Sequence, residues 1–287
     1  MTKVLVIGGQ GQLGQSFKYW APHFPDIEFF FKDLPQFDLL NHQQLHQYFT
    51  SIPTDIVINC AAYTAVDQAE EEPKMAHQLN AVAIDSFCKL SKTFGFKLIH
   101  FSTDYVFDGA KNSSYAEDDR PRPTGVYGKT KARGESVMLK SGIDGWIIRT
   151  SWLFSPYGKN FVKIIFSLLQ NKDEINVVAD QTGSPTYALD LAAATLKVLD
   201  KSPLFVGVKV YHYTNSGHTT WYGLAKAIQS QVDTNCKIHP VNTSEYLSKA
   251  PRPKYSVLSC EKTINEFNLN LNSWELALKD CLIKLKK

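Results

Sequence analysis

Residues 1–14 read MTKVLVIGGQGQLG, and this stretch decides the fold of the chain. Val4 to Ile7 form a short apolar run that predicts a buried strand, and glycines follow at Gly8, Gly11 and Gly14. The spacing predicts a tight turn from the strand into a helix. In such a turn the backbone approaches a pyrophosphate closely, and the helix N-terminus offers N–H groups to its charge.

An acidic residue follows at the distance that a dinucleotide site requires. A second strand is predicted at 28–31, and Asp33 lies 19 residues after Gly14, where a carboxylate can accept hydrogen bonds from an adenosine ribose. Strand, glycine turn, helix, strand and acid together predict a dinucleotide-binding domain. Lys32 beside the acid could meet a 2′-phosphate, so both NADH and NADPH stay open as cofactors.

Two other kinds of site are suggested by residues near the N-terminus, but the sequence lacks a residue that each of them requires. Gly9, Gly14 and Ser16 have the spacing of a nucleotide-hydrolase phosphate loop, but position 15 is glutamine instead of lysine. His42 and His46 have the spacing of a zinc-peptidase helix, but the glutamate base is absent between them. We therefore expect neither activity.

Short apolar runs alternate with longer amphipathic segments through the first half of the chain, which is typical of a doubly wound α/β sheet. We predict an α/β fold: a Rossmann-type parallel sheet in residues 1–150 with a return segment around 186–214, and a smaller, mainly substrate-binding C-terminal lobe in 151–287. The predicted strands are 4–7, 28–31, 56–59, 97–101, 146–149 and 209–213. The predicted helices are 189–199, 274–285 and one that begins at Glu70–Pro73 and turns Met75, Leu79, Val82, Phe87 and Leu90 inward.

The amino-acid composition argues against several classes of function. Hydrophobic residues make up 44% of the 287 residues and the net charge is +3, with basic residues clustered only at 284–287, so we expect no nucleic-acid partner. No apolar run is long enough to span a membrane, and the N-terminus lacks the features of a secretory signal. The five cysteines are widely spaced, which favours reduced thiols and a cytoplasmic location.

Tyr127 and Lys131 stand four residues apart, which places both side chains on one face of a helix. Lowering the pKa of a tyrosine from about 10 to about 7 takes roughly 4 kcal/mol. An ammonium about 4 Å away, at an effective dielectric constant of about 20, supplies that amount. Ser102 and Thr103 end a central strand, where ligands of such sheets bind. These hydroxyls could hold a substrate carbonyl while Tyr127 donates a proton and a cofactor delivers hydride.

The order of these residues resembles the extended short-chain dehydrogenase/reductase superfamily. Five stretches are similar, more specifically, to the dTDP-4-dehydrorhamnose reductase family: 59–67 (NCAAYTAVD), 102–109 (STDYVFDG), 127–131 (YGKTK), 149–152 (RTSW) and 180–186 (DQTGSPT). The resemblance implies an NAD(P)H-dependent reduction of the 4-keto group of dTDP-4-dehydro-L-rhamnose to dTDP-L-rhamnose, a step of dTDP-rhamnose biosynthesis.

The resemblance also implies residue roles. Tyr127 would be the proton donor and Lys131 its partner and ribose anchor, while Thr103, assisted by Ser102, would tune the acid. The sugar-contacting positions match Thr103, Asp104 and Trp152, and Arg252 is assigned to the nucleotide diphosphate. The cofactor positions match Gly8, Gly11, Gln12, Leu13 and Gly14 for the pyrophosphate, Asp33 for the ribose, Asp38 and Leu39 for the adenine, and Ala62, Tyr63 and Thr64 for the wall of the cofactor site.

Several alternatives stay open. A sibling enzyme could reduce a related nucleotide-linked keto-sugar or give the 6-deoxytalose product, and related chains of this fold act as non-catalytic regulatory subunits. Some family members bind magnesium at a dimer contact, but no acidic cluster in this sequence places a metal ion. A homodimer is the expected assembly on general grounds.

Overall fold

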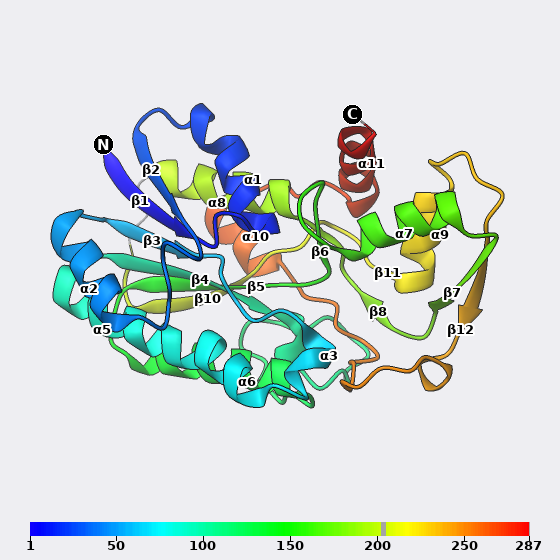
Figure 1. The fold of residues 1–287 in the computed structure, drawn as a ribbon, viewed down its shortest axis with the longest axis horizontal. Helices are drawn as coiled ribbons and strands as arrows, with labels where there is room; N and C mark the ends of the chain where they lie inside the picture. Colours follow the sequence, from blue (N-terminus) through cyan, green and yellow to red (C-terminus); the bar gives the residue numbers. More distant parts are fainter. Residues whose placement is uncertain (202–204, 287) are drawn as a thin grey trace.

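The computed structural model describes residues 1–201 and 205–286. Its larger lobe is built on a six-stranded sheet in the order β10-β5-β4-β3-β1-β2 (Figure 1). Every neighbouring pair in this sheet is parallel. The strands are β1 (Thr2–Ile7), β2 (Ile27–Lys32), β3 (Ile56–Asn59), β4 (Lys97–Thr103), β5 (Gly145–Thr150) and β10 (Val208–His212).

Helices cover both faces of this sheet because alternate residues of each strand are buried on opposite sides. In β1, Val4 and Val6 pack in one apolar cluster and Leu5 and Ile7 in the other. The first cluster includes side chains of α1, α8 and the segment around α10; the second includes those of α2, α5 and α6 (Figure 1). These helices are α1 (Gln12–Trp20), α2 (His42–Ser51), α5 (Ala83–Phe94), α6 (Val126–Lys140), α8 (Ala188–Asp200) and α10 (Glu261–Phe267).

The direction of winding changes next to β1. The chain runs from β1 to β2 on one side and then crosses to β3 on the other. The turns that follow β1 and β3 therefore separate at the carboxyl edge of the sheet. This is where ligands bind in open sheets of this kind, so the topology places the glycine turn at the expected crevice.

The predicted strands are confirmed, each within two residues of its observed ends. The helix predicted from Glu70 is divided into α4 (Pro73–His77), a π-helical turn η2 (Gln78–Val82) and α5, and a separate short helix, α3 (Val66–Ala69), precedes it. The extra residue in the π turn shifts the face that points inward. Phe87 and Leu90 are buried as predicted, whereas Met75 and Val82 are exposed, and that part of the prediction was wrong.

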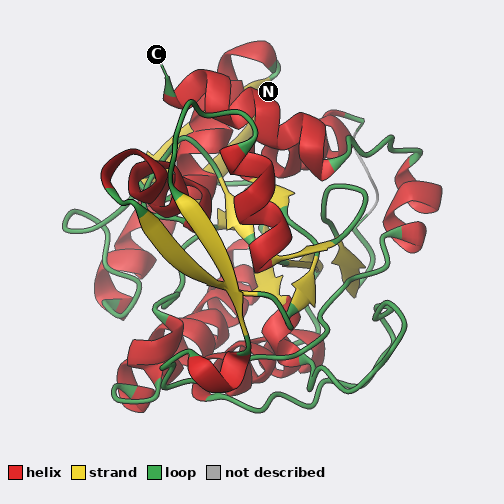
Figure 2. Ribbon diagram, turned by 90° about the vertical axis from the view of Figure 1, so that its right-hand side faces the viewer, coloured by secondary structure: helices red, strands yellow, loops and turns green. Residues whose placement is uncertain are grey.

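The smaller lobe contains its own apolar cluster, with side chains from α7, α9 and α11. Figure 2 faces this lobe and shows its short strands among the helices. Its helices are α7 (Phe161–Asn171), α9 (Trp221–Gln229) and α11 (Trp274–Leu285), and its strand pairs are β6 (Leu153–Phe154) with β9 (Thr186–Tyr187), β7 (Glu174–Val178) with β12 (Lys237–Val241), and β8 (Thr182–Gly183) with β11 (Thr219–Thr220). Elsewhere along the chain, short 3-10 turns follow α1 at η1 (Ala21–His23), β4 at η3 (Asp104–Val106) and β12 at η4 (Thr243–Glu245).

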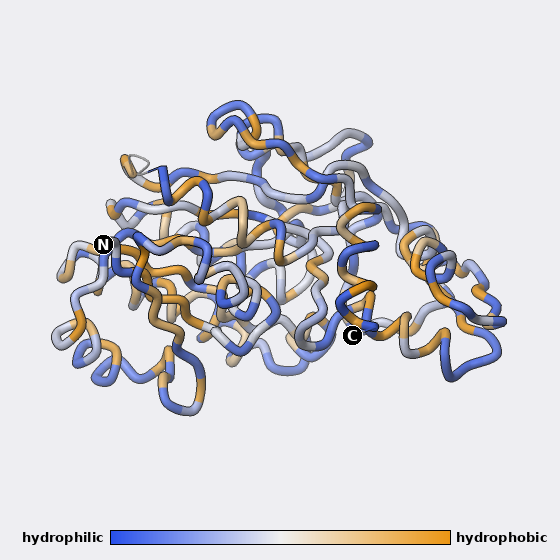
Figure 3. Tube along the Cα trace, turned by 90° about the horizontal axis from the view of Figure 1, so that it is seen from above, coloured by the Kyte–Doolittle hydropathy of each residue, from blue (hydrophilic) through white to orange (hydrophobic). Residues whose placement is uncertain are grey.

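The hydropathy of the chain follows this layout, since apolar segments lie mainly within the two lobes and many outer loops are hydrophilic (Figure 3). The return of the chain to the sheet through α8 and β10 agrees with the segment expected around 186–214, of which 202–204 lie outside the described residues. The division at residue 150 stays a prediction. The basic cluster at the C-terminus ends at Lys287, which is also not described. Among the described helices, none is both long and apolar enough to cross a membrane.

Candidate active site

The turn after β1 brings backbone atoms to the edge of the sheet. Gly8 has a φ of +78°, and a Cβ at Gly14 would lie 2.1 Å from the carbonyl oxygen of Gly8. Both positions therefore disfavour any larger residue. Gly11 precedes α1, and no side chain caps the first turn of that helix. The free N–H groups of this turn fit a pyrophosphate.

The two residues that open α1 have side chains with structural partners. Leu13 is buried in the core between α1 and the sheet, so only its backbone can meet a pyrophosphate. The Gln12 Oε1 accepts hydrogen bonds from Ser155 Oγ at 3.1 Å and Asn160 Nδ2 at 3.0 Å. Gln12 thus ties the glycine turn to the segment after β6.

Asp33 lies against the same turn. Its Oδ2 accepts a 2.7 Å hydrogen bond from the Gln10 backbone N–H, and its Oδ1 accepts one of 2.8 Å from Leu34. The ammonium of the neighbouring Lys32 lies 5.7 Å from the ring centre of Tyr48. The Asp33 carboxylate thus contacts the glycine turn, whereas the Lys32 ammonium lies over the Tyr48 ring. These contacts favour neither NADH nor NADPH.

The predicted adenine contacts have local structural roles. Asp38 Oδ1 accepts a 2.9 Å hydrogen bond from the Leu40 N–H, and the Asp38 N–H donates to Gln44 Oε1 at 2.7 Å. Leu39 is buried in the core beneath α2. These contacts shape the turn before α2, and a role toward adenine stays a prediction.

The predicted cofactor wall at 62–64 is held by an asparagine that the sequence analysis missed. Asn80 is fully buried in η2; its Oδ1 accepts from the Tyr63 N–H at 2.9 Å, and its Nδ2 donates to the Tyr63 carbonyl and to Thr130 Oγ1, both at 3.1 Å. The Tyr63 hydroxyl donates to Glu72 at 2.8 Å. Asn80 therefore fixes the wall against α6.

The carboxyl end of β4 presents polar atoms with unused hydrogen-bonding capacity. Ser102 Oγ and Asp104 Oδ2 are buried and make no hydrogen bond of normal geometry within the described part of the chain, while Ser256 lies near the Asp104 carboxylate and lowers its pKa in part. The Thr103 hydroxyl donates to Asp104 Oδ1 at 3.0 Å and accepts from the Tyr105 N–H at 3.2 Å. Buried polar atoms without partners are costly in a structural role, which points to a polar ligand at this edge.

Tyr127 and Lys131 both lie on α6, but their surroundings differ from the sequence expectation. The Lys131 Nζ donates to the Phe101 carbonyl at 2.6 Å and lies 3.1 Å from His100 Nε2. Burial raises the pKa of Tyr127 to about 12; the neighbouring Thr103 side chain lowers it in part, and Asp104 raises it. The lowering that we expected from Lys131 is not found, because the lysine contacts β4 instead of the phenol.

Burial also acts on the neighbouring ionisable groups. It raises the pKa of Asp104 to about 6. It lowers the pKa of Lys131 to about 8, although the Glu135 carboxylate opposes this change. Both shifts have the sign of desolvation, which disfavours the charged form of each group. The site thus holds an acid and a base whose pKa values are displaced toward neutrality.

The predicted sugar-contacting tryptophan has an unusual backbone. Trp152 has a φ of +47°, and its ring stacks on Trp221 with centres 3.5 Å apart and planes 6° from parallel. A Cβ at Gly183 would lie 2.5 Å from the Trp152 ring. The strained tryptophan is therefore held between a second indole and a glycine.

Arg252, expected at the nucleotide diphosphate, is paired with an acid. Its guanidinium forms two hydrogen bonds with Asp67, at 3.1 and 2.7 Å, and a third with the Ala250 carbonyl at 3.2 Å. The bidentate partner is thus a carboxylate in the first turn of α3, the short helix that follows β3. The diphosphate contact stays a prediction.

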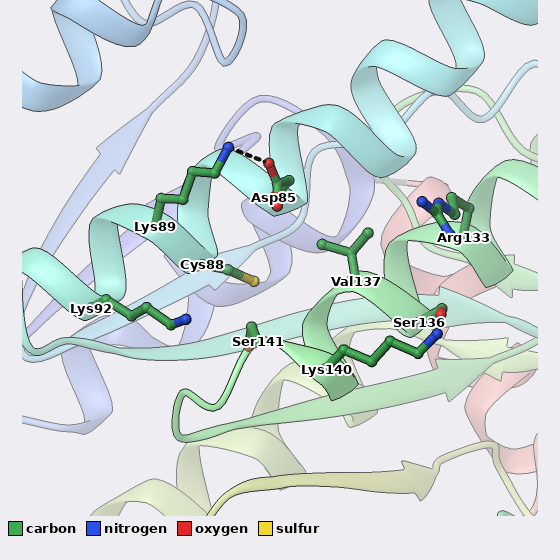
Figure 4. A pocket seen from close by; sticks show the side chains of 9 residues that line it. All are labelled: Asp85, Cys88, Lys89, Lys92, Arg133, Ser136, Val137, Lys140 and Ser141. Atoms are coloured by element: carbon green, nitrogen blue, oxygen red, sulfur yellow. Dashed lines mark ion pairs between the residues drawn. The ribbon is translucent and has the colours of Figure 1, made fainter.

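A cavity lies away from the end of β4. It measures about 390 Å³ and is lined by side chains of α5 and α6 (Figure 4). Lys89 on its rim pairs with Asp85 at 2.7 Å, and both side chains are solvent-exposed. Tyr127 and Lys131 are not among its lining residues, so the cavity is separate from the site at the end of β4.

Across residues 1–201 and 205–286, no three histidine, cysteine, aspartate or glutamate side chains gather as a metal site. The structure therefore provides no support for the magnesium ion left open above.

Comparison with known proteins agrees with this geometry. The family model described as the RmlD substrate binding domain matches residues 1–287. The dTDP-4-dehydrorhamnose reductase of Sinorhizobium fredii is 37% identical over 280 residues, covering 95% of this chain and 94% of the relative. That of Aggregatibacter actinomycetemcomitans is 35% identical over 288 residues, covering 98% of each. The chain belongs to the dTDP-4-dehydrorhamnose reductase family.

Solved structures of the family share the whole fold. The crystal structure of dTDP-4-dehydrorhamnose reductase from Bacillus anthracis in complex with NADP has a TM-score of 0.92 and 37% identity, and the match covers 99% of this chain and 100% of that one. Family membership makes the chain an oxidoreductase with the Rossmann-like fold that the sequence predicted. The NADP of the Bacillus anthracis enzyme agrees with the open glycine turn described here.

Sequence reasoning missed several members of the site. Asn80, His100, Asn59 and Trp221 reach it from elements that are distant in sequence from the residues that they contact. A polar residue within an apolar strand was the available signal for His100 and Asn59. No comparable signal marked Asn80, because its role depends on the π turn.

Proposed function

We propose that this chain reduces the 4-keto group of dTDP-4-dehydro-L-rhamnose to dTDP-L-rhamnose with NADPH or NADH. The observation that carries the proposal is the position of Tyr127 beside Thr103 and Asp104 at the end of β4, where buried polar atoms of Ser102 and Asp104 lack partners among the described residues. The names of the relatives support the choice of a dTDP-linked keto-sugar. The strand end supplies polar groups for a carbonyl and its neighbouring hydroxyls.

Tyr127 is the proton donor in this proposal. Its pKa of about 12 keeps the phenol protonated at neutral pH, which is the form that a reduction requires. Thr103, whose own hydroxyl donates to Asp104, lies beside the phenol and orients it. As negative charge develops on the substrate oxygen, the phenolic proton moves to that oxygen.

The cofactor site is assigned to the glycine turn, Asp33 and the wall at 62–64. The bound NAD(P)H supplies the hydride. The turn after β1 binds the pyrophosphate through backbone N–H groups, and Asn80 holds the wall in place from behind. Trp152, backed by Trp221, and Asp104 orient the sugar.

The test is a reductase assay with the purified chain. It is mixed with dTDP-4-dehydrorhamnose, and the loss of near-ultraviolet absorbance is followed with NADPH and NADH separately. Substrate-dependent oxidation that yields dTDP-L-rhamnose is the expected result. Cofactor binding without oxidation of either coenzyme would contradict the proposal and favour a regulatory role, whereas a 6-deoxytalose product would reassign the stereochemistry.

A further inference from the structure

A chain of buried polar groups runs from β3 through β4 to the lysine of the proposed catalytic pair. The parallel register places Asn59 beside His100. Asn59 Nδ2 lies 3.3 Å from His100 Nδ1, and His100 Nε2 lies 3.1 Å from Lys131 Nζ. All three residues are 1% exposed, so water cannot replace a poorly matched contact.

At the Asn59 end of this row of buried polar groups, the donor and the acceptor of each hydrogen bond are fixed. The Ala61 backbone N–H donates to the Asn59 side chain at 3.1 Å, so the amide atom that it meets must be the oxygen. The Asn59 amide nitrogen, which is only a donor, therefore faces His100 Nδ1. That ring nitrogen has to accept.

The remaining protons follow from this constraint. A neutral histidine that accepts at Nδ1 carries its proton on Nε2. The Nε2–H of His100 then points at Lys131 Nζ, which must accept and is therefore an uncharged amine. The same amine still donates to the Phe101 carbonyl. Each contact in this assignment has one donor and one acceptor.

A charged Lys131 would break the pattern at one point. The ammonium has no lone pair, so Nε2 would have to accept and Nδ1 would carry a proton toward the Asn59 amide nitrogen. Turning the amide over would only move the clash to the Ala61 N–H. A buried contact between two donors is destabilising.

We propose that Asn59 and His100 favour the neutral amine of Lys131 over the ammonium in the ligand-free enzyme, with His100 as its Nε2–H tautomer. The assignment rests on the hydrogen-bond geometry, and its catalytic meaning rests on the function proposed above. Asn59 and His100 are positioning residues, because they act on the reaction through Lys131.

The charged groups around His100 and Lys131 agree with this assignment. Burial lowers the pKa of His100 well below its usual value, so the ring is neutral. Glu135 on α6 faces Lys131 and favours the ammonium, but Arg149 of β5 pairs with that carboxylate at 2.7 Å. Tyr127, on the same helix, is protonated at neutral pH.

The test measures the ionisation of Lys131 directly. Protein labelled with [ε-¹³C]lysine is titrated without ligands, and the Lys131 resonance is assigned by its absence from Lys131→Met. In Asn59→Asp the new carboxylate accepts from Nδ1–H, which leaves Nε2 free to accept from an ammonium. We expect the midpoint of Lys131 to rise by about one pH unit or more, the size of one hydrogen bond.

A second pair of variants separates this relay from a simple charge effect. His100→Leu removes the ring, and Asn59→Asp in that background should move the Lys131 midpoint much less than it does in the wild type. His100→Gln, whose carbonyl can accept from the ammonium, should raise the midpoint and keeps the test available if the leucine variant is unstable.

An unchanged midpoint in Asn59→Asp and His100→Gln would overturn the inference, as would an equal shift with and without His100. These titrations need no substrate, so their outcome is independent of the reductase assay. If the wild-type chain is also active, the limb of its pH profile that belongs to Lys131 should move with the titrated midpoint.

Discussion

At the scale of single residues, the site depends on how burial displaces ionisation. Tyr127 stays protonated because its surroundings penalise the phenolate, and Thr103 limits that penalty. Asp104, with its pKa raised to about 6, is an anion above neutral pH and adds to the penalty. The proposed proton donor is therefore a stable phenol until negative charge develops on the substrate.

Removing the phenol should abolish proton donation and leave binding intact. Tyr127→Phe is expected to lower kcat by a factor of about 10² to 10⁴, the usual contribution of general acid catalysis, while NADPH affinity changes little. Steady-state kinetics and a fluorescence titration of NADPH measure the two quantities. Tyr105→Phe is the matched control, because its ring lies 5.6 Å from that of Tyr127 and at its edge. Equal activity in both variants would remove Tyr127 from the mechanism.

The acid beside the phenol should control the upper limit of the pH profile. Asp104 raises the pKa of Tyr127, so Asp104→Asn should lower it. The protonated phenol is the active form in reduction, and the loss of kcat at high pH should move downward by about one pH unit. The profile is measured from pH 7 to pH 11, with Asp85→Asn on the outer face of α5 as the control. A limb that moves upward or stays in place would contradict this role.

The residue scale also marks the limit of sequence reasoning. The four-residue spacing of Tyr127 and Lys131 predicts a shared helix face, which the structure has. It does not predict that Lys131 turns to His100, which lies 31 positions earlier and is brought close by the packing of α6 on β4. The contacts of Arg252 with Asp67 span 185 positions and were equally out of reach.

At the scale of elements, the turn between β1 and α1 has the strictest steric demands. A Cβ at Gly14 would overlap the carbonyl oxygen of Gly8, and relief requires the strand and helix to move apart. This demand could be predicted from the glycine spacing alone. The break between α4 and α5 could not, because a single extra residue in a π turn leaves the hydrophobic pattern almost helical.

Alanine at this position should therefore disturb both folding and cofactor binding. Gly14→Ala is expected to destabilise the protein by about 2 kcal/mol and weaken NADPH binding more than tenfold, since overpacking costs about 1–3 kcal/mol. Thermal unfolding and NADPH titration are the measurements. Gly142→Ala, at a φ of +73° and with no described atom beyond its chain neighbours within 4 Å of the added Cβ, should lose stability only and bind NADPH normally. Normal NADPH binding by Gly14→Ala would contradict the assignment of the turn.

At the scale of the whole molecule, a buried ion pair joins the sheet to the helix of the proposed catalytic pair. Arg149 of β5 contacts Glu135 of α6 at 2.7 Å, the carbonyl of Glu117 at 3.2 Å and His212 Nε2 of β10 at 3.3 Å. Burial, and to a lesser extent Arg149, lowers the pKa of His212 to about 3, so its ring stays neutral and accepts from the guanidinium. Arg149 thus links β5, α6 and β10 to one another.

Breaking this pair should cost far more than breaking one at the surface. Glu135→Gln leaves a buried guanidinium without its counter-charge, and we expect the free energy of unfolding to fall by about 3 kcal/mol. Asp85→Asn, which breaks the solvent-exposed pair with Lys89, should leave stability unchanged within error. Urea denaturation of both variants gives the comparison. Equal stability of the two variants would show that the buried pair does not hold α6 on the sheet.

The most direct measurement of the central claim follows a deuterium atom. Wild-type protein is supplied with dTDP-4-dehydrorhamnose and reduced cofactor deuterated at either of the two C4 positions of its nicotinamide ring, and the product is analysed by NMR. The proposed function predicts that one of these two deuterated forms of the cofactor delivers its deuterium to C4 of the sugar in dTDP-L-rhamnose. No product, a product without deuterium from either cofactor, or deuterium in a 6-deoxytalose product would contradict it.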